Sequence, residues 1–337
     1  MEKTEQKILI TGGAGYIGSH AVRLFLRQGY SVVVVDNLSH GWKENMDILS
    51  EHGDLTFVKL DLLDQDALAA LFGKYQFSVV LHFAALCSVN ESMQNPGLYF
   101  DNNVKGTMNL LRAMDIAGCK NLIFSSTCAV YGESLYLPMD EEHPTAPGNP
   151  YGESKLMAEQ MIKWYGQLRG INYTILRYFN ACGAASDGMI GDSKKPSLLL
   201  LQNAVRGAMG IEPFSLVCQK VDTPDGTPIR DYIDVEDLAD AHYAAFKYLA
   251  SGKESKLFNL GTGQGWSVKE IIGAVEKYFN ITLDHKLGET RAGEYANVYA
   301  EAATAIQALD WHPKKTLDDS IASLAKWYGQ RPDGYKY

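Results

Sequence analysis

Short apolar runs alternate with helical spacings over the first part of the chain. Ile8–Thr11 and Val32–Val35 are runs of the kind that form buried strands. Between these runs, apolar residues from Ile17 to Phe25 recur at i, i+4, i+7 and i+8, so they share one face of a helix. Gly29 follows that face and is expected to end the helix.

The alternation continues after the second strand. The pattern predicts strands over 56–60, 78–82 and 121–125 and helices over 65–72 and 96–117. Strands that alternate with helices form a parallel sheet covered on both faces, and right-handed crossovers make it doubly wound. The sequence therefore predicts an α/β fold with a Rossmann-type doubly wound parallel sheet.

The composition changes after about Asn180. Residues 183–196 are rich in Gly, Asp, Ser and Lys and are expected to form a long loop, and 222–226 form a turn cluster. We expect a dinucleotide-binding domain over 1–180, to which 233–260 return. A smaller, mixed α/β C-terminal domain over 181–232 and 261–337 is expected to hold the substrate.

A glycine-rich segment joins the first strand to the first helix. Its spacing fits both G-x-G-x-x-G and G-x-x-G-x-x-G. Glycines there allow a tight turn and a close approach of the backbone to a pyrophosphate, while the amides and dipole of the helix start stabilise the anion. The residues expected to bind a dinucleotide here are Gly12, Gly13, Gly15, Tyr16, Ile17 and Gly18.

Asp36 directly follows the second strand, 18 residues after Gly18. A carboxylate at this place accepts hydrogen bonds from the ribose hydroxyls and repels the additional phosphate of NADP. Asn37 to His40 include no arginine that would offset this repulsion, so NAD is the expected cofactor. Asp61, with Leu62 beside it, ends the third strand and either meets the adenine edge or caps a turn.

A tyrosine and a lysine stand four residues apart at the start of another predicted helix. Asn149 suits the N-cap and Pro150 the first turn, which places Tyr151 and Lys155 on one helix face. Ser125 and Thr127 lie at the carboxyl end of a strand, where open α/β sheets bind ligands.

These side chains suit general acid–base chemistry. An unperturbed tyrosine has a pKa near ~10, and a neighbouring ammonium and the positive nicotinamide ring of NAD would favour the phenolate. Tyr151, Lys155 and Thr127 are therefore the candidate catalytic residues for moving a proton on a carbinol while hydride leaves the carbon.

Charge and composition exclude several other classes. The net charge of −9 argues against nucleic acid as a partner, and no run of 18 apolar residues predicts a membrane span. The N-terminus shows no targeting signal. Five scattered cysteines without a C-x-x-C pair indicate free thiols in a reducing cytoplasm, and no metal site is expected.

Taken together, the motifs are similar to those of the extended short-chain dehydrogenase/reductase family, and within it to its UDP-hexose 4-epimerases. The resemblance covers essentially the whole chain. It rests on Thr11–Gly18, Asp36–Asn37, His82–Ala85, Asp101–Val104, Ser125–Thr127, Tyr131–Gly132, Tyr151–Lys155, Arg177–Asn180, Arg230–Ile233 and Arg291–Glu294.

The resemblance implies a mechanism and further site residues. NAD stays bound while Tyr151 takes the proton of the sugar 4-hydroxyl, and a transient 4-keto sugar leads to inversion at C4. Phe83, Ala84, Asn102, Ser125 and Tyr178 are implied to bind NAD. Asn180, Ser197, Arg230, Arg291, Glu294 and Val298, with Thr127 and Tyr151, are implied to bind the UDP-sugar. A homodimer is also implied.

Two departures from the family pattern concern the substrate. Cys87 stands where many members have a lysine, and Val298 stands where members carry either a large or a small residue at the edge of the sugar pocket. The expected function is C4 epimerisation of UDP-glucose and UDP-galactose. The alternatives are UDP-pentoses (xylose and arabinose) or UDP-N-acetylhexosamines as substrates, and an inactive NAD-binding sensor or scaffold.

Overall fold

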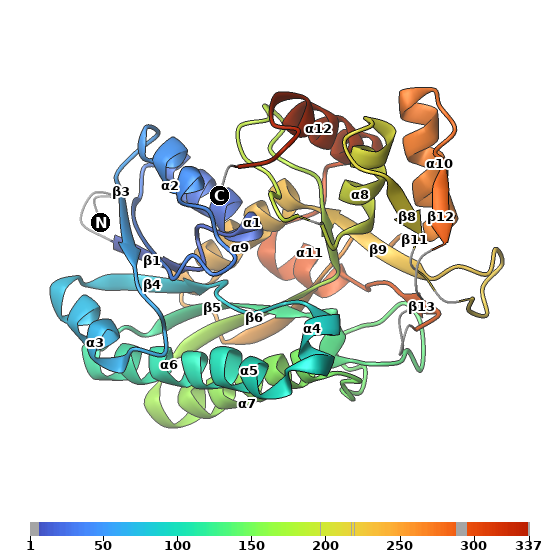
Figure 1. Ribbon diagram of the computed structural model, residues 1–337. Helices are drawn as coiled ribbons and strands as arrows, with labels where there is room; N and C mark the ends of the chain where they lie inside the picture. Colours follow the sequence, from blue (N-terminus) through green and yellow to red (C-terminus); the bar gives the residue numbers. More distant parts are fainter. Residues whose placement is uncertain (1–6, 196, 217, 219, 288–294, 336–337) are drawn as a thin grey trace.

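The computed structural model describes residues 7–195, 197–216, 218, 220–287 and 295–335. Its largest element is a seven-stranded sheet in which every pair of neighbours is parallel (Figure 1). The predicted doubly wound sheet is confirmed, and the strand order reverses beside β1. From one edge to the other the strands are β10 (Lys256–Leu260), β6 (Asn172–Tyr178), β5 (Asn121–Thr127), β4 (Phe77–His82), β1 (Lys7–Thr11), β2 (Ser31–Asp36) and β3 (Leu55–Lys59).

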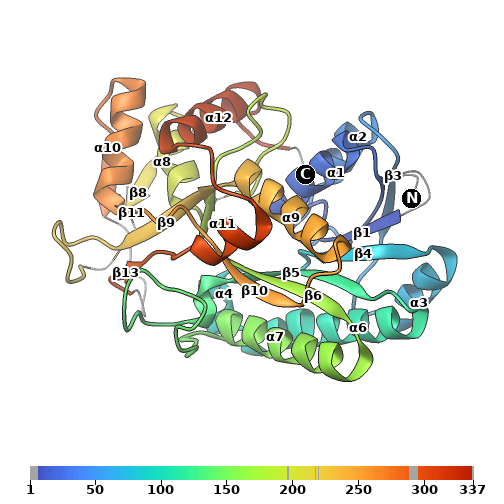
Figure 2. The ribbon, with the colours of Figure 1, turned by 180° about the vertical axis from the view of Figure 1, so that it is seen from behind.

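Alternate residues of each strand enter different cores because successive side chains point to opposite faces. Ile8 and Ile10 pack under α1 (Tyr16–Arg27), α2 (Lys43–Ser50) and α9 (Val235–Ala250). Leu9 packs on the other face, against α3 (Gln65–Lys74), α6 (Gly106–Ala117) and α7 (Pro150–Arg169). Figure 2 shows the same two helical layers from behind.

The helix predicted over 96–117 is continuous but not uniform. It begins as α5 (Pro96–Tyr99), passes through a π-helical segment η1 (Phe100–Lys105) and continues as α6. Asn103 of η1 is buried and its side chain exchanges hydrogen bonds with the backbone N–H and C=O of Leu86 at 2.9 and 3.0 Å. The π-turn thus positions the segment after β4, which also forms the short helix α4 (Val89–Gln94).

The remaining elements form a smaller mixed α/β part. Its core lies between α8 (Leu200–Ala208), α10 (Val268–Phe279) and α12 (Leu317–Gln330). The strand β9 (Ile229–Asp234) pairs with β7 (Asn180–Cys182), β11 (Gly265–Ser267) and β13 (Asn297–Val298), while β8 (Phe214–Leu216) pairs with β12 (His285–Leu287). The helix α11 (Ala303–Leu309) instead joins the core around α9.

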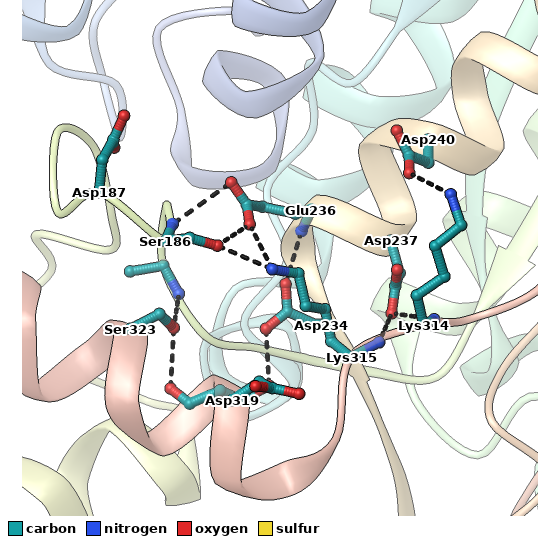
Figure 3. Close-up of polar contacts among 12 residues, drawn as sticks. Ser186, Asp187, Asp234, Glu236, Asp237, Asp240, Lys314, Lys315, Asp319 and Ser323 are labelled. Carbon is teal, nitrogen blue, oxygen red and sulfur yellow. Dashed lines mark hydrogen bonds and ion pairs between the residues drawn. The ribbon is translucent and has the colours of Figure 1, made fainter.

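A polar network fastens the loop after β7 to both parts of the molecule (Figure 3). The backbone and hydroxyl of Ser186 bind the carboxylate of Glu236, which also pairs with Lys315 at 3.1 Å. The hydroxyl of Ser323 accepts the backbone N–H of Ala184 at 2.9 Å. The first part of the predicted loop, around Ala184 and Ser186, is therefore held between α9 and α12.

Candidate active site

A central cavity opens at the carboxyl ends of the parallel strands, between the sheet and the smaller part. Most residues that the sequence assigns to the cofactor line this cavity: Gly12, Gly15, Tyr16, Ile17, Gly18, Asp36, Asn37, Asp61, Leu62, Phe83, Ala84, Asn102, Tyr151, Lys155 and Tyr178. Ligands of open α/β sheets bind at this edge, next to the point where the strand order reverses.

The glycine-rich turn is shaped for a close backbone approach. Gly12 has a φ of +72°, and a Cβ atom on Gly18 would lie 2.2 Å from the carbonyl oxygen of Gly12. Gly13 does not line the cavity; a Cβ atom there would lie 2.8 Å from the Val34 side chain, so its role is packing. The start of α1 has no side-chain cap, which leaves its first amides directed toward an anion.

Asp36 is fixed at the end of β2 by two backbone amides. Its carboxylate accepts the N–H groups of Ala14 at 3.1 Å and Leu38 at 2.8 Å. Burial raises the pKa of this carboxyl, and the two hydrogen bonds oppose that rise. Asp61 accepts the side-chain amide of Asn37 at 2.9 Å and the backbone N–H of Leu63 at 2.9 Å, so it caps its own turn while lining the cavity. Both carboxylates are thus held in place at the wall of the cavity.

Tyr151 is a protonated phenol in the protein alone. Burial raises its pKa well above the ordinary value, Cys87 and Tyr178 add to the rise, and a hydrogen bond with Thr127 opposes it. The ring of Tyr99 meets that of Tyr151 edge-on, with centroids 6.4 Å apart. Tyr151 therefore needs a further positive charge before it can act as a base at neutral pH.

Lys155 does not provide that charge directly. Its ammonium donates to the backbone carbonyl of Ser125 at 2.7 Å, and burial lowers its pKa to about 8. The expectation that this ammonium and the nicotinamide ring of NAD together favour the phenolate stays a prediction. At the cavity wall, Lys155 can therefore lose its proton closer to neutral pH than an exposed lysine does.

A buried histidine, His242, holds the side chain of Ser125 in place next to this site. Burial lowers the pKa of His242 to about 4, so the ring is neutral at neutral pH. Its Nδ1 donates to the carbonyl of Leu238 at 2.7 Å, which leaves Nε2 to accept the Ser125 hydroxyl at 2.9 Å. Ser125 itself does not line the cavity. Its hydroxyl is aimed at His242, and its carbonyl is the partner of Lys155.

Apart from Tyr151, the described residues that are implied to bind the UDP-sugar do not line the central cavity. Of the described ones, Thr127, Asn180, Ser197, Arg230 and Val298 do not line it. Arg230 donates to the backbone carbonyls of residues 229, 295 and 296, and Val298 is its partner in the β9–β13 ladder. Ser197 donates to Asp192 at 3.1 Å. Arg291 and Glu294 lie outside the described residues.

Several lining residues escaped the sequence analysis. The loop after β2 contributes His40 and the loop after β7 contributes Asp192 and Lys194. Cys87, which the sequence analysis names only as a departure from the family pattern, follows β4 and also lines the cavity. Nothing in the spacing of these loop residues marks them, because loops have no hydrophobic period. Among the described residues, no three His, Cys, Asp or Glu side chains are grouped to hold a metal ion, and no described helix is long and apolar enough to cross a membrane.

Comparison with known proteins assigns this arrangement to a family. The model of the NAD dependent epimerase/dehydratase family matches residues 8–261. The chain belongs to this family. The matched segment contains the glycine-rich turn, Asp36, Thr127, Tyr151 and Lys155.

Family members of known activity match over nearly the full length. The UDP-glucose 4-epimerase of Lactobacillus helveticus is 41% identical over 332 residues, which are 98% of this chain and 99% of that protein. The solved UDP-glucose 4-epimerase of Bifidobacterium longum, in complex with NAD+ and UDP, is 36% identical with a TM-score of 0.93 and coverage of 98% and 100%. The UDP-Glc/GlcNAc 4-epimerase of Campylobacter jejuni is 40% identical with a TM-score of 0.83 and coverage of 96% and 99%.

Proposed function

We propose that the protein is an NAD-dependent epimerase that inverts C4 of a UDP-hexose and so interconverts UDP-glucose and UDP-galactose. One observation carries the proposal: Tyr151 and Lys155 line the same cavity as the glycine-rich turn and Asp36. A side chain that can transfer a proton thus lines the proposed dinucleotide-binding cavity. Relatives named UDP-glucose 4-epimerase, at about 40% identity over the whole chain, support the same activity.

The residues present fit NAD in shape and charge. The glycine-rich turn and the uncapped start of α1 would hold the pyrophosphate, and Asp36 would bind the adenosine ribose. The nicotinamide half of NAD would be surrounded by Phe83, Ala84, Asn102, Lys155 and Tyr178. Bound NAD supplies a hydride acceptor and donor for C4 and a positive ring that favours the Tyr151 phenolate.

The chain's own part in the reaction is proton transfer. Tyr151 takes the proton of the sugar 4-hydroxyl and returns it to the same oxygen after the 4-keto sugar has presented its other face. Thr127, whose hydrogen bond lowers the pKa of Tyr151, holds the phenolic oxygen and orients it. Lys155, fixed by Ser125, adds positive charge at the cavity wall.

The residue after Thr127 favours epimerisation over elimination. Family members that eliminate water carry an acidic residue there, whereas this chain has Cys128. Burial raises the pKa of the Cys128 thiol to about 12, so it stays protonated at neutral pH. The acidic side chain that elimination needs is therefore missing at this position.

Four further residues are proposed to bind the UDP-sugar. Asn180 and Arg230, with Arg291 and Glu294, are proposed to contact the sugar diphosphate and the uridine ribose. Arginine suits the diphosphate because its guanidinium matches two phosphate oxygens at once. The strand β7 begins at Asn180 and pairs in parallel with β9. Asn180 lies opposite Tyr232 of β9, two residues after Arg230.

Val298 favours a second sugar class. It lies opposite Arg230 in the β9–β13 ladder and packs with Val130, Phe179 and Ala300. The resemblance implies that residue 298 stands at the edge of the sugar pocket, where a side chain as small as valine would leave room for an N-acetyl group, so UDP-N-acetylhexosamines are proposed as additional substrates. The similarity to a UDP-Glc/GlcNAc 4-epimerase agrees with this proposal.

An exposed apolar face supports a homodimer. On α5 and α7, Leu98 is 49% exposed, Trp164 59% and Leu168 67%. Clustered exposed apolar side chains mark interfaces. Pairing of these helices with those of a second copy would bury them in a four-helix bundle. We further propose a cytoplasmic location, in keeping with the five free cysteines of the described residues.

The division of the chain into two domains supports the same proposal. The described strands of the large sheet fall within 1–180 and 233–260, whereas β7 begins at Asn180 and β9 continues to Asp234, so these two strands of the smaller part cross the proposed boundaries. The proposed boundary after residue 260 runs through shared contacts. The core around α9 and the large sheet includes Ala305 and Leu309 of α11 and, just after this helix, Trp311.

Assay of the purified protein with UDP-galactose tests the proposed function. We expect UDP-glucose as the product without added coenzyme, and NAD released from the protein on denaturation. A protein that holds NAD but converts no UDP-sugar would support the sensor or scaffold alternative instead.

A further inference from the structure

An ammonium group from the smaller part of the molecule reaches the central cavity. Lys194, on the loop after β7, donates to Cys87, on the segment after β4, with an Nζ···Sγ distance of 3.6 Å across 107 residues of chain. Both residues line the central cavity, on opposite sides. The contact therefore joins the two parts of the molecule directly over the proposed cofactor site.

The surroundings of this pair place it midway along the cavity. The pKa of His40, on the loop after β2, is lowered by burial and then by the charge of Lys194. At the other end, Cys87 is the largest influence on the pKa of Tyr151 after burial. His40 and Lys194 also line a second, adjoining cavity together, whereas Cys87 lines only the central cavity, with Tyr151, so the pair lies between the proposed adenosine half and the reactive half.

The backbone beside Lys194 is firmly held. Asp192 is buried, accepts the Lys194 backbone N–H at 3.3 Å and the Ser197 hydroxyl at 3.1 Å, and its carbonyl accepts the indole N–H of Trp327 at 3.1 Å. The ammonium is also kept charged, because Cys87 and Asp192 raise its pKa, with a smaller contribution from Glu91, against the effect of burial. A fixed positive charge is therefore present whether or not a ligand is bound.

The present partner of this ammonium is a weak one. A thiol sulfur is a poor acceptor, and it occupies one of the three N–H donors of the lysine. The other lysine among the described lining residues, Lys155, is committed to the Ser125 carbonyl, and no arginine is among them. A doubly negative pyrophosphate would otherwise meet only backbone amides and the dipole of α1.

We propose that Lys194 binds the pyrophosphate of the dinucleotide from the smaller part of the molecule, opposite the start of α1. The inference rests on the proposed function, since it needs NAD in the central cavity.

Retention of NAD by the purified, NAD-loaded protein tests the inference. The rate at which NAD is lost on dilution is measured for the parent, for Lys194→Met and for Lys195→Met as the matched control. Lys195 is the neighbouring lysine and pairs with Asp333 at 2.8 Å. A charge-assisted hydrogen bond is lost in Lys194→Met, so we expect NAD to leave about tenfold faster or more. Lys195→Met is expected to match the parent.

A charge transplant separates the charge from the fold of the loop. The double variant Cys87→Lys/Lys194→Met carries the ammonium on the opposite wall and is expected to recover slow NAD loss. Equal rates for the parent and Lys194→Met, an equal effect of Lys195→Met, or no recovery in the double variant would overturn the inference. So would unchanged NAD loss with a raised KM for UDP-galactose, which would assign Lys194 to the substrate. A parent that holds no NAD would instead overturn the proposed function.

Discussion

The ammonium of Lys155 donates a hydrogen bond to the backbone carbonyl of Ser125, with 2.7 Å between Nζ and the oxygen. This contact fixes the lysine to the end of β5, while the phenol of Tyr151 on the same helix face remains strongly desolvated. The two residues therefore form a site whose acid–base behaviour depends on what occupies the cavity.

Removal of the Tyr151 hydroxyl tests its role in proton transfer. Tyr151→Phe is expected to lower kcat for UDP-galactose by about 10²–10⁴-fold, the usual contribution of a general acid–base group. NAD content should stay at the parent level, because the ring still packs against Tyr99. Tyr165→Phe on the same helix, where the hydroxyl contacts Met108, is the control and should keep parental activity. A Tyr151→Phe variant with most of the activity would show that another group moves the proton.

The lowered pKa of Lys155 predicts a pH-dependent cost of burial. The folded protein loses this proton near pH 8, whereas the unfolded chain keeps it up to about 10.5. Between these two pH values unfolding takes up a proton. The contribution of Lys155 to the free energy of unfolding therefore increases with pH. Below pH 8 both states are charged and the folded state carries the full cost.

Lys155→Met removes this contribution. In cofactor-free protein, its unfolding free energy relative to the parent should be most favourable near pH 7 and should decline as pH rises from about 8 toward 10.5. Denaturant unfolding of both proteins across this range measures the difference. A difference that stays constant with pH would contradict a depressed pKa for this lysine. The variant should also lose turnover.

The size of residue 298 is expected to set sugar selectivity. Val298 is 6% exposed and lies in register with Arg230, beside the proposed sugar position. Val298→Tyr should lower kcat/KM for UDP-N-acetylglucosamine more than tenfold while changing that for UDP-galactose much less, since only the N-acetyl group needs the space. Val298→Ala is the control and should retain both activities. Equal losses on both sugars in the tyrosine variant would place the residue away from the N-acetyl group.

An acidic residue in the exposed apolar face should prevent dimer formation. Trp164 is 59% exposed on α7, and Trp164→Glu would bury an unpaired carboxylate in the proposed four-helix bundle. Light scattering after gel filtration should give twice the chain mass of 37.2 kDa for the parent and the single mass for the variant. Lys163→Glu, at the adjacent position of the helix, serves as the charge control. A parent that elutes as a monomer would refute the proposed dimer.

The sequence predicts the first half of the fold well because its signals are local. Apolar runs such as Val32–Val35 and the spacing from Ile17 to Phe25 reflect burial within single elements. The smaller part is different, since strands such as β7 and β13 have only three and two residues and depend on β9 for their pairing. The sequence could not indicate such elements, because they are too short for a period.

The site shows the same division. Asp36 and Tyr151 follow recognisable local patterns, and both line the central cavity. Lys194 stands in a loop without a hydrophobic period, and its partner Cys87 is 107 residues away. The sequence pattern also does not indicate the π-turn around Asn103, whose side chain makes a tertiary hydrogen bond to the backbone of Leu86. Contacts between segments that are far apart in the sequence can be identified only in the folded structure.

The fate of a deuterium at C4 tests the central claim most directly. If hydride leaves C4 and returns within one site while Tyr151 handles only the hydroxyl proton, 4-deuterated UDP-galactose should give UDP-glucose that keeps the deuterium at C4, even in ordinary water. Mass spectrometry and NMR of the product measure this retention. A product in which the C4 deuterium has been replaced by solvent hydrogen would contradict the account.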